Sequence, residues 1–119
     1  MSQTSRRYPI TTEVLDYLFA FNGNYKYVIN QFEFGKVRDP YDAVDLIDLL
    51  LKSIKELADH DYIEERIDEL EKIYIQLGKF SDNIVWNYEV NGYYNPDTIL
   101  DYLEEVHSMI EKIYERELP

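Results

Sequence analysis

Three aspartates spaced three residues apart, Asp42, Asp45 and Asp48, are the first residues whose type and spacing could do chemistry. Carboxylates at this spacing share one side of a helix, where they can hold a divalent metal ion. A helical wheel places them opposite the apolar residues of the same segment, such as Ile47 and Leu51, and a charged face opposite a core usually faces solvent. We therefore predict a charged surface here, with no metal and no cofactor.

Glu65 and Asp68 form a second acidic pair further along the chain. Together with Asp45 and Asp48, they approximate the two-helix acidic pattern of the all-α nucleotide pyrophosphatases. The resemblance is partial, because the motifs of that family rely on glutamates where this sequence has Asp45 and Asp48. It implies a metal-dependent nucleotide hydrolase, which is the third of our functional hypotheses.

The two histidines, His60 and His107, are of a residue type that can bind metal ions or act in catalysis. Glu104-x-x-His107 is similar to one half of the ligand set of carboxylate-bridged di-metal bundles. The second half is missing, because the residue three before His60 is Leu57. Neither histidine has the following lysine of phosphotransfer domains or the preceding arginine of HEPN-type ribonucleases. We expect His107 to lie at the boundary of the core, and we predict no catalytic residue and no enzyme.

The composition excludes several classes of protein. The chain has 119 residues and no cysteine, which excludes disulfide frameworks, thiolate catalysis and cysteine-based zinc sites. The N-terminal arginines are not followed by an apolar stretch, as they would be in a signal peptide. No apolar run approaches the roughly 20 residues of a membrane span. These features predict a cytoplasmic protein without a membrane partner.

The charge is distributed unevenly along the chain. Of the net charge of −12, residues 1–39 contribute +1 and residues 40–119 contribute −13. Such an acidic surface repels phosphate backbones, so we expect no direct binding to nucleic acid. A strongly basic protein is the partner that this charge favours.

Apolar residues recur at alternating three- and four-residue spacings in four stretches, which is the periodicity of helices. The apolar positions of the fourth stretch are Ile99, Leu103, Val106, Ile110 and Ile113. They predict helices at residues 12–34, 40–59, 61–90 and 95–117. Short connections make consecutive helices antiparallel neighbours. The predicted fold is all-α, an antiparallel up-down-up-down four-helix bundle, as a single domain over residues 1–119 with a flexible segment at 1–10.

Candidate cap residues support these helix starts. Asp39-Pro40 and Asn95-Pro96 each place a side-chain acceptor before a proline, which is well tolerated in the first turn. Either threonine of Thr11-Thr12 can cap the first helix. Asp61 with Glu64 has the form of a capping box.

Two glycines lie inside predicted helices. The apolar phase continues through Gly23 and Gly78, which favours interior positions over helix ends. The phase also continues through Ile84 and Tyr88, so residues 85–90 are assigned to the third helix and not to a strand. A first helix that ends at Gly23-Asn24 remains an alternative.

Tyrosine is the most over-represented residue, with 12 copies against five phenylalanines and one tryptophan. Tyr74 and Tyr88 fit the edge of the core, whereas Tyr93 and Tyr94 lie in a predicted loop. An exposed tyrosine beside carboxylates suits a protein interface, because it combines a rigid aromatic ring with a polar tip.

The leading hypothesis is a small acidic helical binding protein that inhibits a basic, nucleic-acid-handling partner by covering its positive surface. In composition and helicity the chain is similar to acidic DNA-mimic and immunity proteins, which implies an immunity protein, an antitoxin or a phage-encoded anti-defence inhibitor. The alternative is a structural or regulatory subunit of an oligomer, and a homodimer is left open. The predicted partner-binding residues are Asp42, Asp45, Asp48, Glu56, Glu65, Asp68, Tyr93 and Tyr94.

Overall fold

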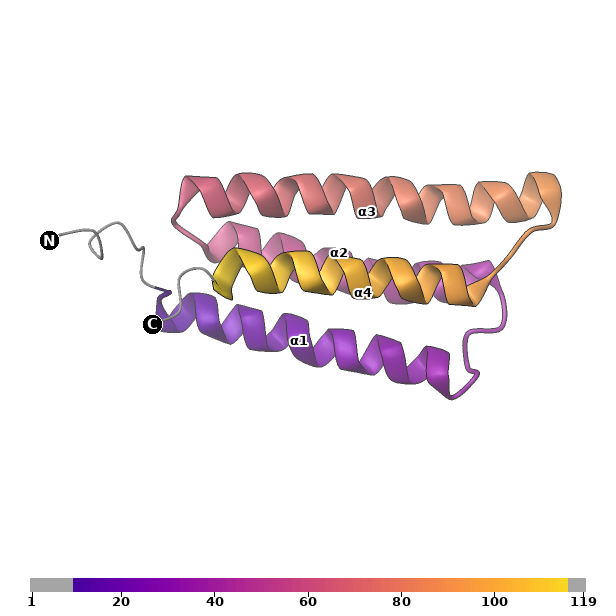
Figure 1. The fold of residues 1–119 in the computed structure, drawn as a ribbon, viewed down its shortest axis with the longest axis horizontal. Helices are drawn as coiled ribbons and strands as arrows, with labels where there is room; N and C mark the ends of the chain where they lie inside the picture. The colour runs from indigo at the N-terminus through magenta and orange to yellow at the C-terminus, as the bar shows by residue number, and fades with distance from the viewer. Residues whose placement is uncertain (1–9, 116–119) are drawn as a thin grey trace, which may run out of the picture.

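The computed structural model describes residues 10–115, so most of the segment predicted to be flexible lies outside the described residues. Four helices follow one another: α1 (Thr12–Glu33), α2 (Pro40–His60), α3 (Glu64–Asn91) and α4 (Pro96–Glu115). They alternate in direction along one long axis (Figure 1), and the described part of the chain contains no strand. The predicted all-α, up-down-up-down four-helix bundle is confirmed.

Polar side chains cap the N-termini of three helices, largely as predicted. Thr11 caps α1 by accepting a hydrogen bond from the backbone N–H of Val14. Asp39 caps α2 in the same way, with Pro40 in the first turn. Before α4, the Asn95 side chain accepts from the N–H of Asp97 at 3.0 Å.

The predicted start of the third helix is wrong. Helix α3 begins at Glu64, and its N-cap position, Ile63, makes no side-chain capping bond. The Asp61 carboxylate accepts instead from the backbone N–H groups of Tyr62 and Ile63, so it holds the turn before the helix. The capping box is not formed, because Asp61 lies two residues too early to cap α3.

Helices α1 and α3 run without interruption through their glycines, Gly23 and Gly78. The alternative in which Gly23 ends a short first helix is therefore wrong. Helix α3 also includes residues 85–90, as predicted, and ends at Asn91, with Gly92 as its C-cap. That glycine has a left-handed backbone, with φ of +69°, which other residues rarely adopt.

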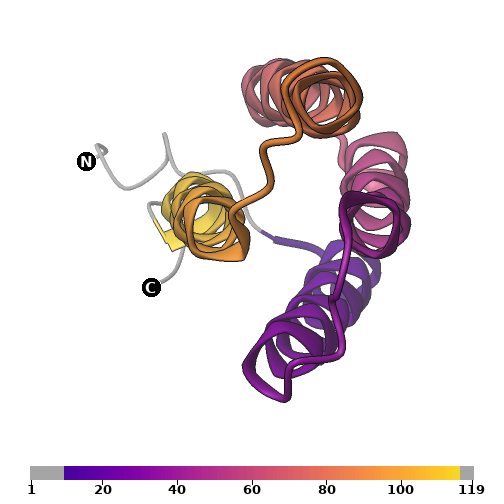
Figure 2. The same cartoon turned by 90° about the vertical axis from the view of Figure 1, so that its right-hand side faces the viewer.

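Seen along the bundle axis, α1, α2 and α3 form a curved layer, and α4 lies on its concave side (Figure 2). Helix α2 packs closely against both α1 and α3, whereas α4 contacts α1 and α3 less closely. Aromatic rings bridge the wider spacing around α4: Phe80 stacks on Tyr102 at 4.2 Å, and Tyr25 stacks on His107 at 4.0 Å between ring centroids. The bundle is elongated, 58 × 25 × 20 Å.

All four helices share one hydrophobic core. On α2, Leu50 and Leu57 are buried, as their place on the apolar arc predicts, and Ala43 is buried as well, because this helix has a close neighbour on each side. On α3, Tyr74 and Tyr88, which were predicted to fit the edge of the core, are exposed, at 37% and 39%. The five apolar positions predicted for α4 are all buried: Ile99, Leu103, Val106, Ile110 and Ile113.

Candidate protein-binding surface

A buried polar cluster holds together the end of the bundle where α2 turns into α3. Arg66 is only 1% exposed and donates two hydrogen bonds to the Asp61 carboxylate, from Nε at 2.9 Å and from Nη2 at 2.7 Å. Tyr114, near the end of α4, donates its hydroxyl to the same carboxylate at 2.7 Å. With the N–H groups of Tyr62 and Ile63, the carboxylate accepts five hydrogen bonds. We call Asp61, Arg66 and Tyr114 the buried triad.

The electrostatics of the triad follow from burial and hydrogen bonding. Burial of the Asp61 carboxyl acts to raise its pKa, but hydrogen bonds from Arg66, Tyr114 and Ile63 outweigh burial and lower the pKa overall. Burial and the same carboxylate raise the pKa of Tyr114. Asp61 is therefore ionised and Tyr114 neutral near pH 7. The triad ties α4 to the α2–α3 turn, which fixes the surface around it.

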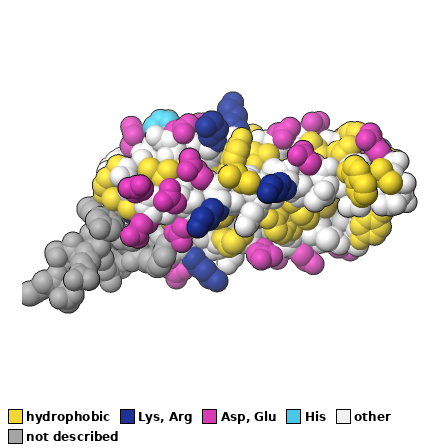
Figure 3. Space-filling view, turned by 90° about the horizontal axis from the view of Figure 1, so that it is seen from above, with side chains coloured by type: hydrophobic (Ala, Val, Ile, Leu, Met, Phe, Trp, Pro, Cys, Tyr) yellow, Lys and Arg dark blue, Asp and Glu magenta, His cyan; other side chains and the backbone are white. Residues whose placement is uncertain are grey.

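That surface is dominated by exposed carboxylates. They lie on the last turns of α2 and the first turns of α3, and in the space-filling view acidic side chains crowd the end at which α3 begins (Figure 3). Lys55 pairs with one of them, Asp59, at 3.9 Å. We define the acidic end as the surface formed by Glu56, Asp59, Glu64, Glu65, Asp68 and Glu71.

The predicted partner-binding carboxylates divide between the two ends of the bundle. Glu56, Glu65 and Asp68 belong to the acidic end, where Glu65 and Asp68 are exposed and Glu56 is half-buried. Asp45 and Asp48 are exposed on α2 near the opposite end, because α2 and α3 are antiparallel. At 1.5 Å per residue, Asp45 and Asp68 are roughly 24 Å apart along the axis. The structure therefore does not bring them together as the metal-binding pattern of a nucleotide hydrolase would require.

Asp42 has a local structural role at the start of α2. Its carboxylate accepts a hydrogen bond from the backbone N–H of Arg38 at 3.2 Å, and its own N–H is bonded to Asp39. The side chain is half-buried, in contrast to the exposed Asp45 and Asp48. Asp42 thus stabilises the α1–α2 connection and presents less of its carboxylate to a partner than the other two aspartates.

Aromatic and apolar side chains are exposed at the end where α3 finishes, and Figure 3 shows apolar surface at that end. Trp86 and Val90 are 57% and 59% exposed and lie four residues apart on α3. Tyr41 of α2 meets Tyr88 edge to face and donates its hydroxyl to Glu89 at 2.7 Å, which raises the pKa of Tyr41. The aromatic end consists of Tyr41, Trp86, Tyr88, Val90 and Tyr93.

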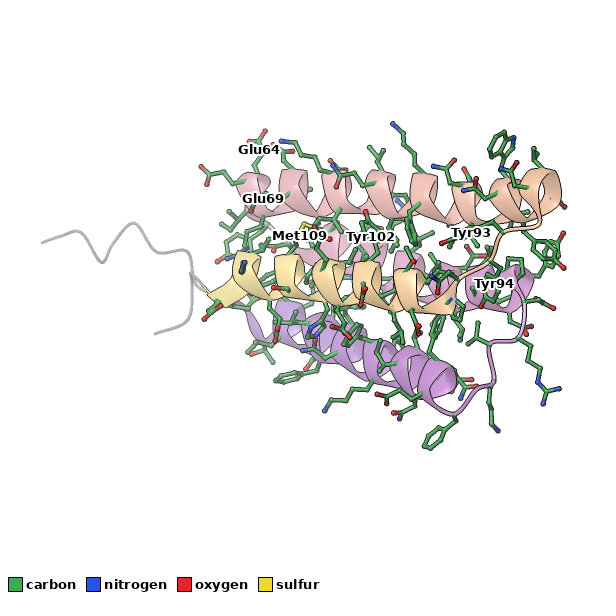
Figure 4. The ribbon with its side chains drawn as sticks, turned by 45° about the vertical axis from the view of Figure 1, so that its right-hand side comes forward. Glu64, Glu69, Tyr93, Tyr94, Tyr102 and Met109 are labelled. Carbon is green, nitrogen blue, oxygen red and sulfur yellow. The ribbon has the colours of Figure 1, made fainter. Side chains whose placement is uncertain are left out.

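The two loop tyrosines differ in exposure. Both lie in the connection between α3 and α4 (Figure 4), but Tyr93 is exposed, whereas Tyr94 is half-buried and packs against the core. Burial, together with the carboxylates of Asp39 and Asp42, raises the pKa of Tyr94 to about 12. Of the predicted pair, Tyr93 presents more of its ring to a partner.

The sequence analysis did not predict Trp86 and Val90 as surface residues of interest, although their four-residue spacing on α3 places both on one side of the helix. Both positions lie on the side of α3 opposite Leu77 and Ile84, where a helix of a soluble bundle normally carries polar residues. It also missed Arg66, which occupies a core position one turn before Leu70. A charged residue in a core phase indicates a buried ion pair.

The histidines take part in packing between helices. His107 stacks on Tyr25, donates a hydrogen bond from Nε2 to the Oδ1 atom of Asn22 at 3.0 Å, and lies 3.4 Å from Glu111. His60 stacks on Tyr17 at 3.9 Å. His107 therefore lies at the boundary of the core, as predicted. In the described part of the chain, no three histidine or acidic residues are grouped closely enough to hold a metal ion.

A groove of about 700 Å³ runs between α3 and α4. Its floor includes Ile73 and Met109, and its rim carries both signs of charge, with Glu69 and Lys112 on opposite helices (Figure 4). The groove is lined by two acidic and two basic side chains, Glu69, Glu115, Lys72 and Lys112, so it lacks the uniform charge of the acidic end. Within residues 10–115, no helix is long and apolar enough to cross a membrane.

Fold and surface together define a small all-α protein, a four-helix bundle with an acidic exterior. The chain is 50% identical over 117 residues to a protein of Acidianus bottle-shaped virus (isolate Italy/Pozzuoli), "Uncharacterized protein OR117". The match covers 98% of this chain and 100% of the viral protein, and the chain belongs to the family of that protein. No family model matches the chain, and no solved structure matches it.

Proposed function

We propose that the protein binds a basic, nucleic-acid-handling protein and inhibits it by covering its positive surface. The observation that carries the proposal is the acidic end, whose carboxylates lie on helices that the buried triad ties together. Carboxylates arranged on rigid helices can pair with the lysines and arginines that otherwise meet phosphates. A fixed array loses little conformational entropy when it binds.

The aromatic end supports the same proposal at the other end of the α2–α3 pair. Exposed tyrosine and tryptophan rings are frequent anchors in protein interfaces, and arginine side chains stack on their faces. Asp45 and Asp48 lie near these rings along α2. A partner that contacts α2 and α3 along their length would thus meet carboxylates near both ends of the bundle. It would meet the aromatic anchors at the aromatic end alone.

The relative is a viral protein, which is consistent with an inhibitor acting against a nucleic-acid-handling protein of the infected cell. Complementary charge would also accelerate the encounter and make binding sensitive to salt. We propose that the protein acts in the cytoplasm, as an inhibitor of the immunity, antitoxin or anti-defence type, without catalysis of its own.

The experiment is a capture assay with the immobilised chain and an Acidianus lysate. We expect basic proteins to be retained at about 0.05 M NaCl and released at about 0.5 M, where charges are strongly screened. The captured protein is then purified, and its binding to labelled double-stranded DNA or to RNA is followed by fluorescence anisotropy. Nucleic-acid binding that persists in the complex would contradict the proposal.

Charge reversal tests which surface is used. Glu65→Lys with Asp68→Lys should weaken capture at least about tenfold, equivalent to about 1.4 kcal/mol, because two attractive contacts become repulsive. The matched control is Asp101→Lys with Glu105→Lys, which changes the net charge equally on the exposed side of α4. Equal losses in the two variants would assign the effect to net charge and reject the acidic end as the site.

A further inference from the structure

Glu89 lies between two exposed aromatic rings at the aromatic end. Its Oε2 atom accepts a hydrogen bond from the Tyr41 hydroxyl at 2.7 Å. Trp86 lies three residues before Glu89 on α3, so the indole and the carboxylate are neighbours on the surface of that helix. Tyr41 is 47% exposed and Trp86 is 57% exposed. A side chain of another molecule that reaches Glu89 therefore meets an aromatic ring beside it.

The chain does not neutralise the Glu89 carboxylate. Within residues 10–115, the Tyr41 hydroxyl is its one hydrogen-bond donor, and it takes part in no ion pair. No lysine or arginine lies three or four residues away from it on α3. Asp45, one turn after Tyr41 on α2, is exposed and likewise has no basic residue at these spacings. Both carboxylates are therefore available to a cation from outside the chain.

The charge around these carboxylates is negative even when every nearby basic residue is counted. The half of the bundle that contains the aromatic end comprises residues 23–52 and 79–105, which hold eleven acidic and five basic side chains. The basic residues are Lys26, Lys36, Arg38, Lys52 and Lys79. Arg38 is the nearest of them to Tyr41 in sequence, and in the described part of the chain it forms no ion pair and lies over no ring. A positively charged side chain is thus the occupant that the charge of this half favours.

The combination of rings and carboxylates distinguishes arginine from lysine. A guanidinium group is planar, so it can lie flat on an indole or phenol ring while its forked N–H groups donate to a carboxylate beside that ring. The ammonium group of lysine is a compact and strongly hydrated point charge, and it has no flat surface to stack. A carboxylate placed beside an exposed ring therefore favours arginine, whereas a carboxylate without a ring attracts either cation.

We propose that the aromatic end binds an arginine side chain of a basic partner, with the guanidinium paired to Glu89 and stacked on Trp86. Tyr41 is a positioning residue, because its hydroxyl bond fixes the Glu89 carboxylate. Tyr41 meets Tyr88 and the two helices are antiparallel, so Asp45 lies within about one turn of Trp86 along the bundle axis and can pair with the same arginine or a neighbouring one. This inference rests on the proposed function, since it names the side chain by which the basic partner is recognised.

Calorimetric titration of the full chain with two synthetic peptides tests the preference. One peptide alternates arginine with glycine and is blocked at both ends, and the other is its lysine counterpart of the same length and charge. The arginine peptide should bind at least about fivefold more tightly, the size expected of one or two exposed cation–π contacts. Trp86→Leu, which keeps apolar bulk without the ring, should reduce the ratio below about twofold. Phe19→Leu, the control at an exposed ring of α1, should leave the ratio unchanged.

Two further variants test the roles of Glu89 and Tyr41. Glu89→Gln should weaken binding of the arginine peptide at least about threefold more than Asp101→Asn, which removes an equal charge from the exposed side of α4. Tyr41→Phe should weaken it about twofold in the wild-type chain and not in the Glu89→Gln background, because the hydroxyl acts through the carboxylate. Backbone amide NMR signals that shift with the arginine peptide should be those around Tyr41 and Trp86.

Three outcomes would overturn the inference. They are equal affinity for the two peptides, a preference that survives Trp86→Leu, and NMR shifts confined to the acidic end. Self-association of the chain that is lost on Trp86→Leu would also overturn it, because the rings would then serve a second copy. The proposed function fails separately: if the preference for arginine holds but nucleic-acid binding persists in the captured complex, the arginine contact stands and inhibition is rejected.

Discussion

Arg66 and Asp61 leave water together when the chain folds, and the stability of that pair depends on each hydrogen bond to the Asp61 carboxylate. Removing one member of a buried pair leaves the other charged and unsatisfied, which is far more costly than losing an exposed pair. Arg66 also lies 5.5 Å from the ring of Tyr62 and 5.3 Å from that of Tyr114. Three segments therefore depend on the charge of two residues: the α2–α3 turn, the start of α3 and the end of α4.

Asp61→Asn should lower the free energy of unfolding by about 3–5 kcal/mol, because it breaks the buried ion pair with Arg66. Asp59→Asn is the control, since it removes an exposed carboxylate paired with Lys55 and should cost less than about 1 kcal/mol. Urea denaturation near pH 7 measures both. Similar losses in the two variants would show that the triad contributes no special stability.

The same pair predicts how stability depends on pH. The pKa of Asp61 is lowered in the folded chain, so its contribution is complete above the unfolded value of about 3.9 and is lost as the pH falls through the folded pKa. Stability of the wild type should therefore fall more steeply below about pH 4 than that of Asp61→Asn. Parallel pH profiles would contradict this assignment.

Among the elements, α4 differs from the others in how it packs. Helices α1, α2 and α3 approach one another closely, whereas α4 is held through ring stacks, including Phe80 with Tyr102, and through Tyr114. Contacts made mainly by side-chain ends let a helix separate from its neighbours at lower cost than contacts between close backbones. Helix α4 is thus the element in which local opening should begin.

Hydrogen–deuterium exchange tests this order. Backbone amides of α4 should exchange at least about tenfold faster than those of α2, which packs between two neighbours. Tyr114→Phe should accelerate exchange in α4 further and leave the middle of α2 unchanged, because it removes one bond to the triad. Equal protection of the two helices would show that the bundle opens only as a whole.

The elements were predictable because local signals agreed. The apolar spacing of α4 matched its buried face at all five positions, and Asp39 capped α2 as its place before Pro40 indicated. The predicted capping box at Asp61 was wrong because the Asp61 carboxylate bonds to side chains beyond the first turn of the predicted helix. Arg66 lies five residues away in the sequence, and Tyr114 lies 53 residues away. A pattern of local acceptors cannot distinguish a helix cap from a carboxylate committed to a tertiary ion pair.

The surface was less predictable than the core. Sequence periodicity indicated that Asp45, Asp48, Glu65 and Asp68 point outward, and all four are exposed. Their distribution between two ends depends on the antiparallel pairing of α2 with α3. Whether these carboxylates bind a partner stays a prediction, since exposure is equally expected of a surface that only confers solubility.

At the scale of the whole molecule, the excess of negative charge opposes folding. An elongated bundle with a net charge of −12 repels itself, and salt reduces that repulsion. We expect Tm to rise between about 0.02 M and about 0.5 M NaCl, although the same salt should weaken capture of a basic partner. Asp101→Lys with Glu105→Lys should show a smaller rise. A fall in Tm with salt would indicate that attractive ion pairs dominate.

Trp86 gives the molecule a built-in optical probe. It is the only tryptophan of the chain, and its indole is already more than half exposed in the folded state. Its fluorescence therefore changes little when the bundle unfolds, so it is a poor reporter of stability. Because it lies at the aromatic end, its emission responds instead to anything that excludes water there, without a label attached to the chain.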